Sequence, residues 1–351
     1  MDTDSPTEPA SEPTEETLPP SSAPDSFRVS CIGFAIAEDA ENVGQTVGQL
    51  VRVFGCRFDL SHLDAVTVAY DYRQALLDLD RGYETSHQLT PSDEYAVGVA
   101  MTPSVIRDGV VKSHILLNAN VIAPIAVEDD PRNRLAVHVL AHECAHVEIT
   151  RKFDGAFPDW TLRHRFADIW ERARSEVSSA VWEEYAATTL SAPFGEDPTN
   201  GYEDTFISVL GAARDRANEA IIAYRTRENE GIDQVVVDVY GTYGNLLKFA
   251  AYHLGNLAGS RRTYASMPRT VAALDGHWFS PYFERLRFAC STLMENYGNW
   301  TELSVFDLIA DIADEIVAEG GLHFSRLADG RVHVNIPYTR DTMPASWEPE
   351  D

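Results

Sequence analysis

The run His142-Glu143-Cys144-Ala145-His146 constrains this chain more than any other feature of its sequence, because it reads H-E-x-x-H inside a helix-forming stretch. Residues four apart on a helix lie about 40° apart around its axis, so both imidazoles can reach one ion. Glu143 projects about 100° from His142 and therefore lies beside that ion, not among its ligands. A zinc site with a bound water and a carboxylate that takes the water's proton has this geometry. We predict a metal site here; the alternative is a coincidental surface pattern.

Flanking residues suggest where the metal-binding helix begins and ends. Asp129 or Asp130 is the expected N-cap, and Pro131 suits the first turn. Arg151 and Lys152 suit the C-terminal turn, where cations interact favourably with the helix dipole.

Two other residues of this helix are not expected to bind the ion. Cys144 lies about 200° from His142 and is predicted to pack in the core. His138 lies about 12 Å along the axis from His146, so the three histidines cannot share one ion. We interpret His138 as a core residue or as a residue that supports a ligand.

A catalytic zinc usually has three protein ligands and one open position, so a third ligand is needed. It is normally supplied by a following helix, and Glu184 continues the apolar stripe of the helix predicted over Thr161–Ala192. From Phe166 to Glu184 the chain advances 18 residues, which is five turns with no net rotation. A carboxylate on a buried stripe is costly unless a cation neutralises it. Glu183 projects about 100° away and is predicted to face solvent, but it remains the alternative ligand. The stripe consists of Phe166, Ile169, Trp170, Ala173, Val177, Ala180 and Val181.

A residue that stabilises an oxyanion is harder to find, because no local pattern selects one. His253, Tyr240 and Tyr243 are candidates by residue type alone.

The N-terminal half alternates strand and helix patterns, and a small sheet is expected just before the metal-binding helix. Asp108-Gly109 is a strong hairpin signal between two β-type runs. An edge strand of this sheet could bind an extended peptide beside the metal, or the sheet could be a plain support. The predicted strands are Phe27–Ala37, Leu63–Tyr70, Tyr95–Ile106 and Val110–Leu117, with helices over Asn42–Phe54 and Tyr72–Asp80.

The remainder of the chain reads as helix, apart from an irregular connection over 259–281 and a terminal hairpin around Asp329-Gly330. The predicted fold class is therefore α+β: a small mixed or antiparallel sheet with a hairpin packs on the H-E-x-x-H helix, as in zincins, and a mostly helical C-terminal region follows. We expect a zincin-like metallopeptidase domain over 27–195 and a mainly helical region over 202–340. The predicted helices are Tyr202–Arg227, Ile232–Ala258, Phe283–Asn296 and Leu303–Glu319, and the hairpin strands are Leu322–Leu327 and Arg331–Ile336.

Charge and composition limit the partners that the chain can have. Its formal net charge is -27. Residues 1–26 hold seven of the acids and no Lys or Arg, which predicts a disordered acidic tail, with a docking role as the alternative. A negative field repels phosphate backbones and anionic lipid, so we expect no direct nucleic-acid partner and no membrane association.

Targeting features indicate a cytoplasmic protein. The four cysteines form no C-x-x-C pair, which fits a reducing compartment. The N-terminus lacks the layout of a signal peptide, and no apolar run reaches the length of a membrane span.

The motif and its surroundings resemble the ImmA/IrrE family of zinc-dependent metallopeptidases. That family has a small sheet with a hairpin and then a helix that reads roughly T-L-A-H-E-L-G-H, and the matching stretch here is Val139-Leu140-Ala141-His142-Glu143-Cys144-Ala145-His146. A second helix supplies a glutamate before an alanine-rich turn, matched by Glu183-Glu184-Tyr185-Ala186-Ala187. The resemblance covers about residues 64–192. It departs from the family at Val139 and Ala145, and the glutamate–alanine spacing is one residue off if Glu184 is the ligand.

The resemblance implies a zinc (Zn2+) peptidase whose substrate is a protein or peptide, and members of the family often act on a partner repressor. Together with the spacing of these residues, the resemblance leads us to expect zinc held by His142, His146 and Glu184, with Glu143 as the general base of peptide-bond hydrolysis. Two alternatives stay open. One is a non-catalytic interaction protein with a degenerate or structural metal site, and the other is a hydrolase of non-peptide amides.

Overall fold

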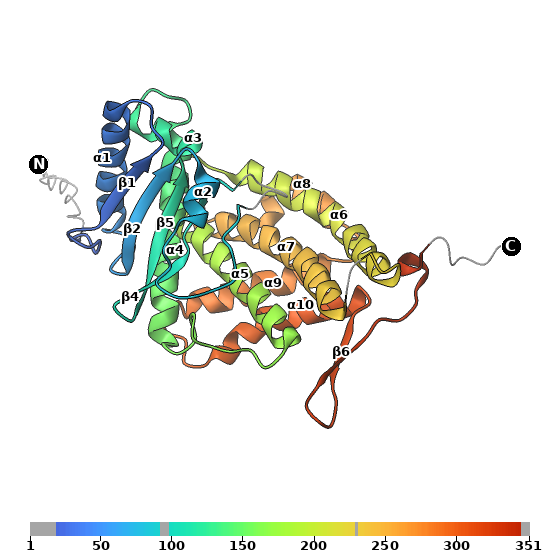
Figure 1. Ribbon diagram of the computed structural model, residues 1–351. Coiled ribbons are helices and arrows are strands. Elements are labelled where there is room, and N and C mark those ends of the chain that lie inside the picture. The colour runs from blue at the N-terminus through green and yellow to red at the C-terminus, as the bar shows by residue number, and fades with distance from the viewer. Residues whose placement is uncertain (1–18, 92–97, 229–230, 345–351) are drawn as a thin grey trace, which may run out of the picture.

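A five-stranded mixed sheet lies at one end of the molecule and a bundle of long helices at the other (Figure 1). The computed structural model describes residues 19–91, 98–228 and 231–344. The arrangement confirms the predicted α+β class, with a small mixed sheet followed by a helical C-terminal region.

Three strands of the sheet are parallel and two are antiparallel to them. β1 (Arg28–Ile32), β2 (Leu63–Ala69) and β5 (Val110–Asn118) run parallel in that order. β3 (Ala100–Met101) and β4 (Ser104–Arg107) both pair antiparallel with β5. Parallel neighbours need crossover connections, and helices provide them here.

The hairpin predicted at Asp108-Gly109 joins β4 to β5, and both turn residues have positive φ (52° and 77°). The single long strand predicted over Tyr95–Ile106 is wrong in its described part, because Thr102-Pro103 separates β3 from β4. Proline has no N–H to donate to a ladder, so it interrupts the strand. Residues 95–97 of that run lie outside the described residues.

The two faces of the sheet pack against different helices. Val66, Val68, Ile115 and Leu117 lie in the main core, which also includes residues of α1 (Ala37–Phe54) and α4 (Asn133–Ala156). The opposite face carries a small separate cluster in which Leu116 packs on Tyr72 and Leu76 of α2 (Tyr72–Leu77). This alternation is the period-two pattern of a strand that is covered on both faces. A short helix, α3 (Ala119–Ile122), and a 3₁₀ turn over Ala123–Ala126 lead from β5 toward α4.

The ends of α4 differ from the prediction. The N-cap residue is Arg132, and neither Asp129 nor Asp130 caps the helix. The Asp130 carboxylate instead accepts the backbone N–H of Arg132 at 2.8 Å, and this turn delays the helix start to Asn133. Arg151 is not in the last turn either, because the helix runs on to Ala156, and its guanidinium pairs with Asp59 at 3.3 Å.

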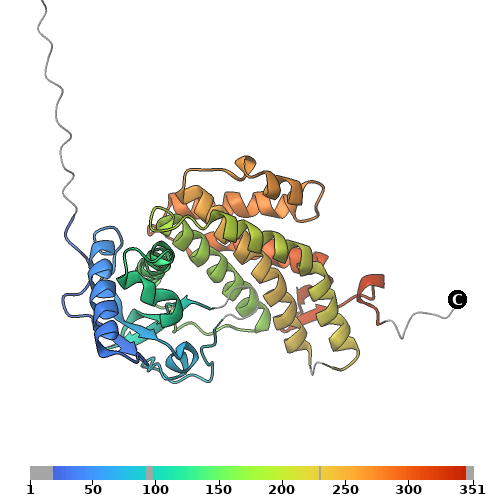
Figure 2. The same ribbon diagram turned by 90° about the horizontal axis from the view of Figure 1, so that it is seen from above.

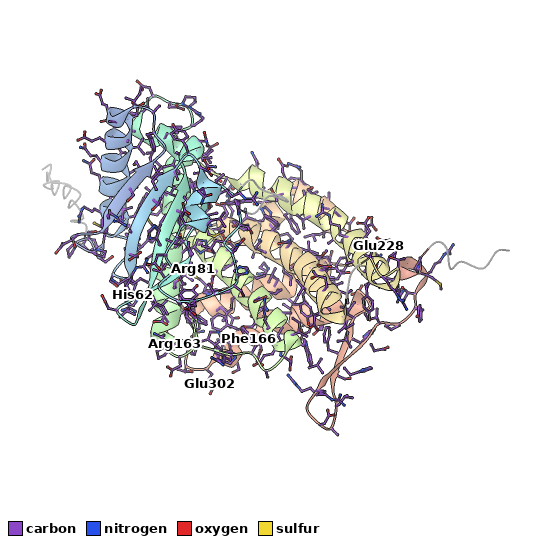
Figure 3. The ribbon with its side chains drawn as sticks, viewed as in Figure 1. His62, Arg81, Arg163, Phe166, Glu228 and Glu302 are labelled. Carbon is purple, nitrogen blue, oxygen red and sulfur yellow. The ribbon has the colours of Figure 1, made fainter. Side chains whose placement is uncertain are left out.

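The second helix of the site, α5 (Ile169–Ser191), begins later than the predicted Thr161. The Asp168 carboxylate accepts the Glu171 N–H at 2.9 Å and caps it. Arg163 and Phe166 lie on the connection from α4 (Figure 3), where Arg163 donates to the Gly109 carbonyl at 3.0 Å. Phe166 is thus outside the helix, but the stripe from Ile169 to Val181 still sets the direction of Glu184.

The remaining helices build the bundle. α7 (Ile232–Gly259) packs on both α5 and α6 (Thr199–Arg225), as two views show (Figures 1 and 2). The connection over 259–281, predicted to be irregular, contains α8 (Pro268–Leu274), whose proline occupies the first turn. The other elements are α9 (Ser280–Glu295), α10 (Asp307–Glu319) and the predicted terminal hairpin, formed by β6 (His323–Arg326) and β7 (Val332–Asn335).

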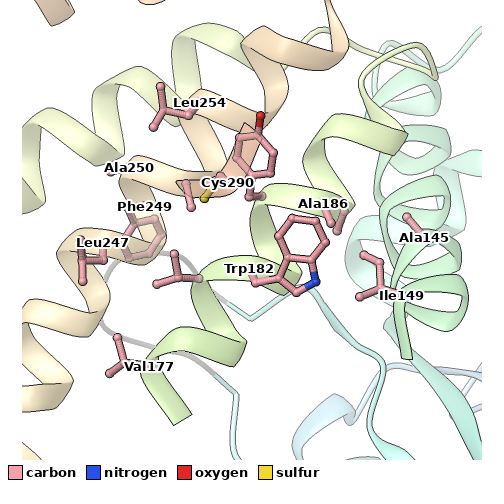
Figure 4. Packing of buried hydrophobic residues seen from close by; sticks show 14 of the residues in the cluster. Ala145, Ile149, Val177, Trp182, Ala186, Leu247, Phe249, Ala250, Leu254 and Cys290 are labelled. Atoms are coloured by element: carbon pink, nitrogen blue, oxygen red, sulfur yellow. The ribbon is translucent and has the colours of Figure 1, made fainter. Parts of the chain in front are cut away.

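One hydrophobic core runs through both halves of the chain. Trp182 on α5 is only 1% exposed, and the same hydrophobic cluster includes Ile149 of α4, Phe249 of α7 and Cys290 of α9 (Figure 4). The division into 27–195 and 202–340 stays a prediction, but the core crosses that boundary. Among the described helices, none combines the length and the apolar character that a membrane crossing needs.

The packed chain begins earlier than the predicted limit of the tail. The Ser22 hydroxyl donates to the Phe58 carbonyl at 2.6 Å and accepts the Leu60 N–H at 2.9 Å, and Ala23 is buried. Residues 19–26 therefore do not all belong to a disordered tail. Residues 1–18 lie outside the described residues.

Candidate metal centre

The three predicted ligands come together between α4 and α5. The Nε2 atoms of His142 and His146, one turn apart on α4, are 3.1 Å from each other. The Oε2 atom of Glu184 on α5 is 3.3 Å from the first and 3.4 Å from the second. All three side chains are largely shielded from solvent, with exposed fractions of 10%, 15% and 19%.

These distances fit a zinc ion. Ligand atoms about 2.0–2.1 Å from a tetrahedral zinc are separated by roughly 3.3–3.4 Å, close to each side of the observed triangle. The Glu184 Oε2 atom is buried and has no hydrogen-bond partner among the described residues. A buried unsatisfied carboxylate oxygen is costly, whereas a cation between the three side chains would satisfy it. Two histidines and one glutamate are also a known ligand set of catalytic zinc.

The electrostatics of the triangle favour positive charge. Burial alone would lower the pKa of His146, but the Glu184 carboxylate outweighs it and raises this pKa to about 9. Conversely, although burial acts in the other direction, the imidazoles of His146 and His142 hold the pKa of Glu184 well below its ordinary value. A carboxylate that stays ionised while buried is a suitable ligand for a cation.

Glu143 lies beside the triangle and not within it, as predicted. It is only 6% exposed, and its Oε2 atom accepts a hydrogen bond from the Thr102 hydroxyl at 2.6 Å. Thr102 occupies the break between β3 and β4, so the sheet edge orients this carboxylate. Sequence reasoning missed Thr102, although the Thr102-Pro103 break in a β-type run was a usable signal.

The alternative ligand Glu183 does not join the triangle. Its side chain is exposed, as predicted from the 100° step between neighbouring helix positions. Among the described residues, the group found that could hold a metal ion consists of His142, His146 and Glu184.

Helices from the C-terminal region complete the surroundings of the ligands. Tyr252 on α7 stacks on the His142 ring, with centroids 5.8 Å apart and planes at 11°. Burial and then the charge of Glu184 raise the pKa of Tyr252 well above its ordinary value, and its hydroxyl donates to that carboxylate. Tyr202 on α6 lies against Tyr252, at a centroid distance of 5.2 Å.

His138 lies outside the group that could hold a metal ion, in line with the interpretation from sequence. Burial and then the charge of His142 lower its pKa to about 4, so its ring is neutral at neutral pH. Its Nδ1 lies 3.1 Å from the Phe194 carbonyl and must donate, which leaves Nε2 to accept from the Tyr202 hydroxyl at 3.3 Å.

The three residues suggested for oxyanion stabilisation make their contacts elsewhere. His253 Nε2 lies 2.9 Å from the Thr270 hydroxyl, and Tyr240 donates to Asp314 at 2.6 Å. The Tyr243 ring lies against Gly320. Tyr252 and Tyr202 are the tyrosines near the ligands, and no sequence signal could have selected them, because only the packing of α6 and α7 brings them there.

Comparison with known proteins adds no assignment: no family model, no curated protein and no solved structure matches this chain. The resemblance to the ImmA/IrrE family therefore stays a prediction that rests on the motif and its surroundings.

Proposed function

We propose that this chain is a zinc-dependent metallopeptidase of the H-E-x-x-H type. The observation that carries the proposal is the triangle of His142, His146 and Glu184, with the Glu143 carboxylate oriented beside it by Thr102. The three candidate ligand atoms come from two helices, are shielded from solvent and lie 3.1–3.4 Å from one another. A coincidental surface pattern would not assemble them in this way.

The chain's own residues have distinct tasks in this proposal. A bound zinc would supply a Lewis acid and lower the pKa of a water molecule. Glu143 accepts a proton from the attacking water and later gives it to the leaving amine nitrogen. The Thr102 hydroxyl donates a hydrogen bond to Oε2 of that carboxylate, which leaves Oε1 to accept the proton. Tyr252 orients Glu184 by its hydrogen bond.

A peptide is the favoured substrate because a strand edge lies beside the general base. β3 and β4 pair with β5 on one side, and Thr102 stands between them next to Glu143. An extended peptide can add to such an edge through main-chain hydrogen bonds. By resemblance, the substrate is a cytoplasmic protein such as a repressor-type regulator.

The chemistry is tested by Glu143→Gln, with metal content and peptide cleavage measured on the same samples. Parent and variant should both hold about one zinc per chain, because Glu143 is not a ligand. Cleavage of a library of fluorogenic peptides should fall at least about a hundredfold, since an amide cannot accept the proton.

Each other outcome selects a different function. Equal cleavage by parent and variant would show that Glu143 is not the base. A zinc-loaded parent that cuts no peptide but hydrolyses small amides would favour the non-peptide amide hydrolase. If neither protein binds zinc, the non-catalytic interaction protein becomes the better assignment.

A further inference from the structure

A second cluster of reactive side chains lies on the other face of the sheet from α4. A cavity of about 660 Å³ opens there, and β1, β2 and β5 form its floor while α2 forms a wall. Thr67 and His114 lie on this floor, and Asp64 lines the same cavity. Neither the metal ligands nor Glu143 lines it.

The three side chains form a continuous relay. Asp64 Oδ2 lies 2.9 Å from Nδ1 of His114, and Nε2 of the same ring lies 2.9 Å from the Thr67 hydroxyl. Burial lowers the pKa of His114 despite the carboxylate beside it, so the ring is neutral at neutral pH. The ionised carboxylate only accepts, so Nδ1 carries the proton and donates. The Nε2 lone pair therefore accepts from the Thr67 hydroxyl.

A β-bulge turns Asp64 toward this relay. In a regular strand, residues 64 and 67 would point to opposite faces. The register between β2 and β5 shifts between Leu63 and Ala65, which makes Asp64 the extra residue and lets its carboxylate reach the same face as Thr67. Arg107 then clamps that carboxylate, with its Nε and Nη2 atoms at 3.1 and 3.2 Å from the two oxygens.

We propose that Thr67, His114 and Asp64 form a second hydrolytic site, independent of the metal centre, that acts on small carboxylic esters. A hydroxyl bonded to an imidazole whose other nitrogen is held by a carboxylate is the arrangement that activates nucleophiles in acyl transfer. Arg28 lines the same cavity and its charge acts on His114, so positive charge is available near a developing oxyanion. Three further carboxylates line the cavity and favour uncharged or cationic esters; they belong to Asp71, Asp78 and Asp80.

The reaction balances with water as the only co-reactant. The Thr67 oxygen forms a bond to the ester carbonyl carbon while its proton passes to Nε2 of His114. The alcohol leaves with that proton, and an acyl-threonine ester remains. Water then attacks the same carbon, gives a proton to Nε2, and releases the acid, while Thr67 regains its proton from the ring.

The test uses p-nitrophenyl acetate as the probe with the full chain. The parent should release nitrophenol faster than buffer does, and a zinc chelator should leave this rate unchanged. Thr67→Val, which keeps the shape but lacks the hydroxyl, should lower the rate at least about a hundredfold, and Thr67→Ser should retain it. Acid-quenched samples should carry an acetyl group on the peptide that contains Thr67.

Ser30 provides the matched control. It lies opposite Thr67 in the β1–β2 register and so on the same face of the sheet. Ser30→Val should leave the rate unchanged, and melting temperatures should show that all variants are folded. The proposal is overturned if the parent does not exceed buffer, if Thr67→Val hydrolyses the probe as fast as the parent, or if the chelator removes the activity.

Discussion

Glu183 and Glu184 are neighbours in the chain, yet only one of them faces the two imidazoles. Glu184 is 19% exposed and its Oε2 atom lies 3.3 Å from His142, whereas Glu183 is exposed. At the residue scale, helix rotation alone separates a proposed metal ligand from a solvent-facing side chain.

Zinc titration distinguishes the two glutamates. Glu184→Gln should weaken zinc binding by more than about a hundredfold, because loss of a ligand should exceed the 10–100-fold effect typical of residues that only support one. Glu183→Gln is the control and should bind zinc like the parent. Equal losses in the two variants would contradict the assignment of Glu184.

Tyr252 permits a subtler test of the surroundings of the metal. Tyr252→Phe keeps the ring that stacks on His142 but removes the hydroxyl that donates to Glu184. Zinc affinity should fall by about 10–100-fold without a large change in melting temperature. Competition with a chromophoric chelator measures the affinity. A Tyr252→Phe protein with the affinity of the parent would show that the hydroxyl does not orient the ligand.

At the scale of elements, the position of Glu184 depends on how closely α5 approaches α7. Gly255 of α7 has no room for a methyl group, since a Cβ would lie 2.2 Å from the Thr188 hydroxyl oxygen and 2.3 Å from the Tyr185 carbonyl oxygen. Tyr185 and Thr188 follow Glu184 within about one turn of α5. A close helix contact from the C-terminal region therefore holds the helix that carries Glu184 in place.

Gly255→Ala should separate the two helices. We expect the free energy of unfolding to fall by about 1–3 kcal/mol and zinc affinity to fall with it, because the overpacked contact shifts the helix that carries Glu184. Gly241→Ala on the same helix is the control: its Cβ would meet nothing within 4 Å, so stability should rise by about 0.5–1 kcal/mol. Urea denaturation and zinc titration measure both effects. A Gly255→Ala protein as stable as the parent would show that the helices tolerate the methyl group.

At the scale of the whole molecule, buried polar groups join elements that are distant in sequence. His253 of α7 is fully buried, bonded to Thr270 of α8 and stacked on Phe206 of α6. Burial lowers its pKa to about 4 even though the Glu203 carboxylate acts in the opposite direction. The folded protein thus holds this ring neutral in a region where three helices meet.

The stability of the bundle should consequently depend on pH. The unfolded chain binds a proton at His253 below about pH 6.5, whereas the folded protein binds it only near pH 4. The free energy of unfolding should therefore fall by up to about 3 kcal/mol as pH falls through this window. His253→Gln should flatten that part of the profile, measured by urea denaturation at several pH values. His323→Gln, at an exposed position, should not, and equal slopes for the parent and His253→Gln would contradict the assignment.

The sequence by itself determined what local periodicity controls. His142 and His146 share a helix face because they are four residues apart, and Glu184 continues the buried stripe of its own helix. Asp108-Gly109 and Asp329-Gly330 marked hairpins because the turn residues are local. Helix ends are harder to predict, because an aspartate can either cap a helix or close a turn before it. Asp168 caps α5, whereas Asp130 closes a turn before α4.

Only the tertiary structure decided which segments meet. Thr102 reaches Glu143 because a strand is interrupted beside α4, and Tyr252 covers His142 because α7 packs on α5. His114 and Asp64, 50 residues apart, meet only because β2 and β5 are neighbours and a bulge shifts their register. Strand order and helix packing arise from long-range burial of apolar surface, and residue spacing along one chain does not encode which of many similar faces will pair.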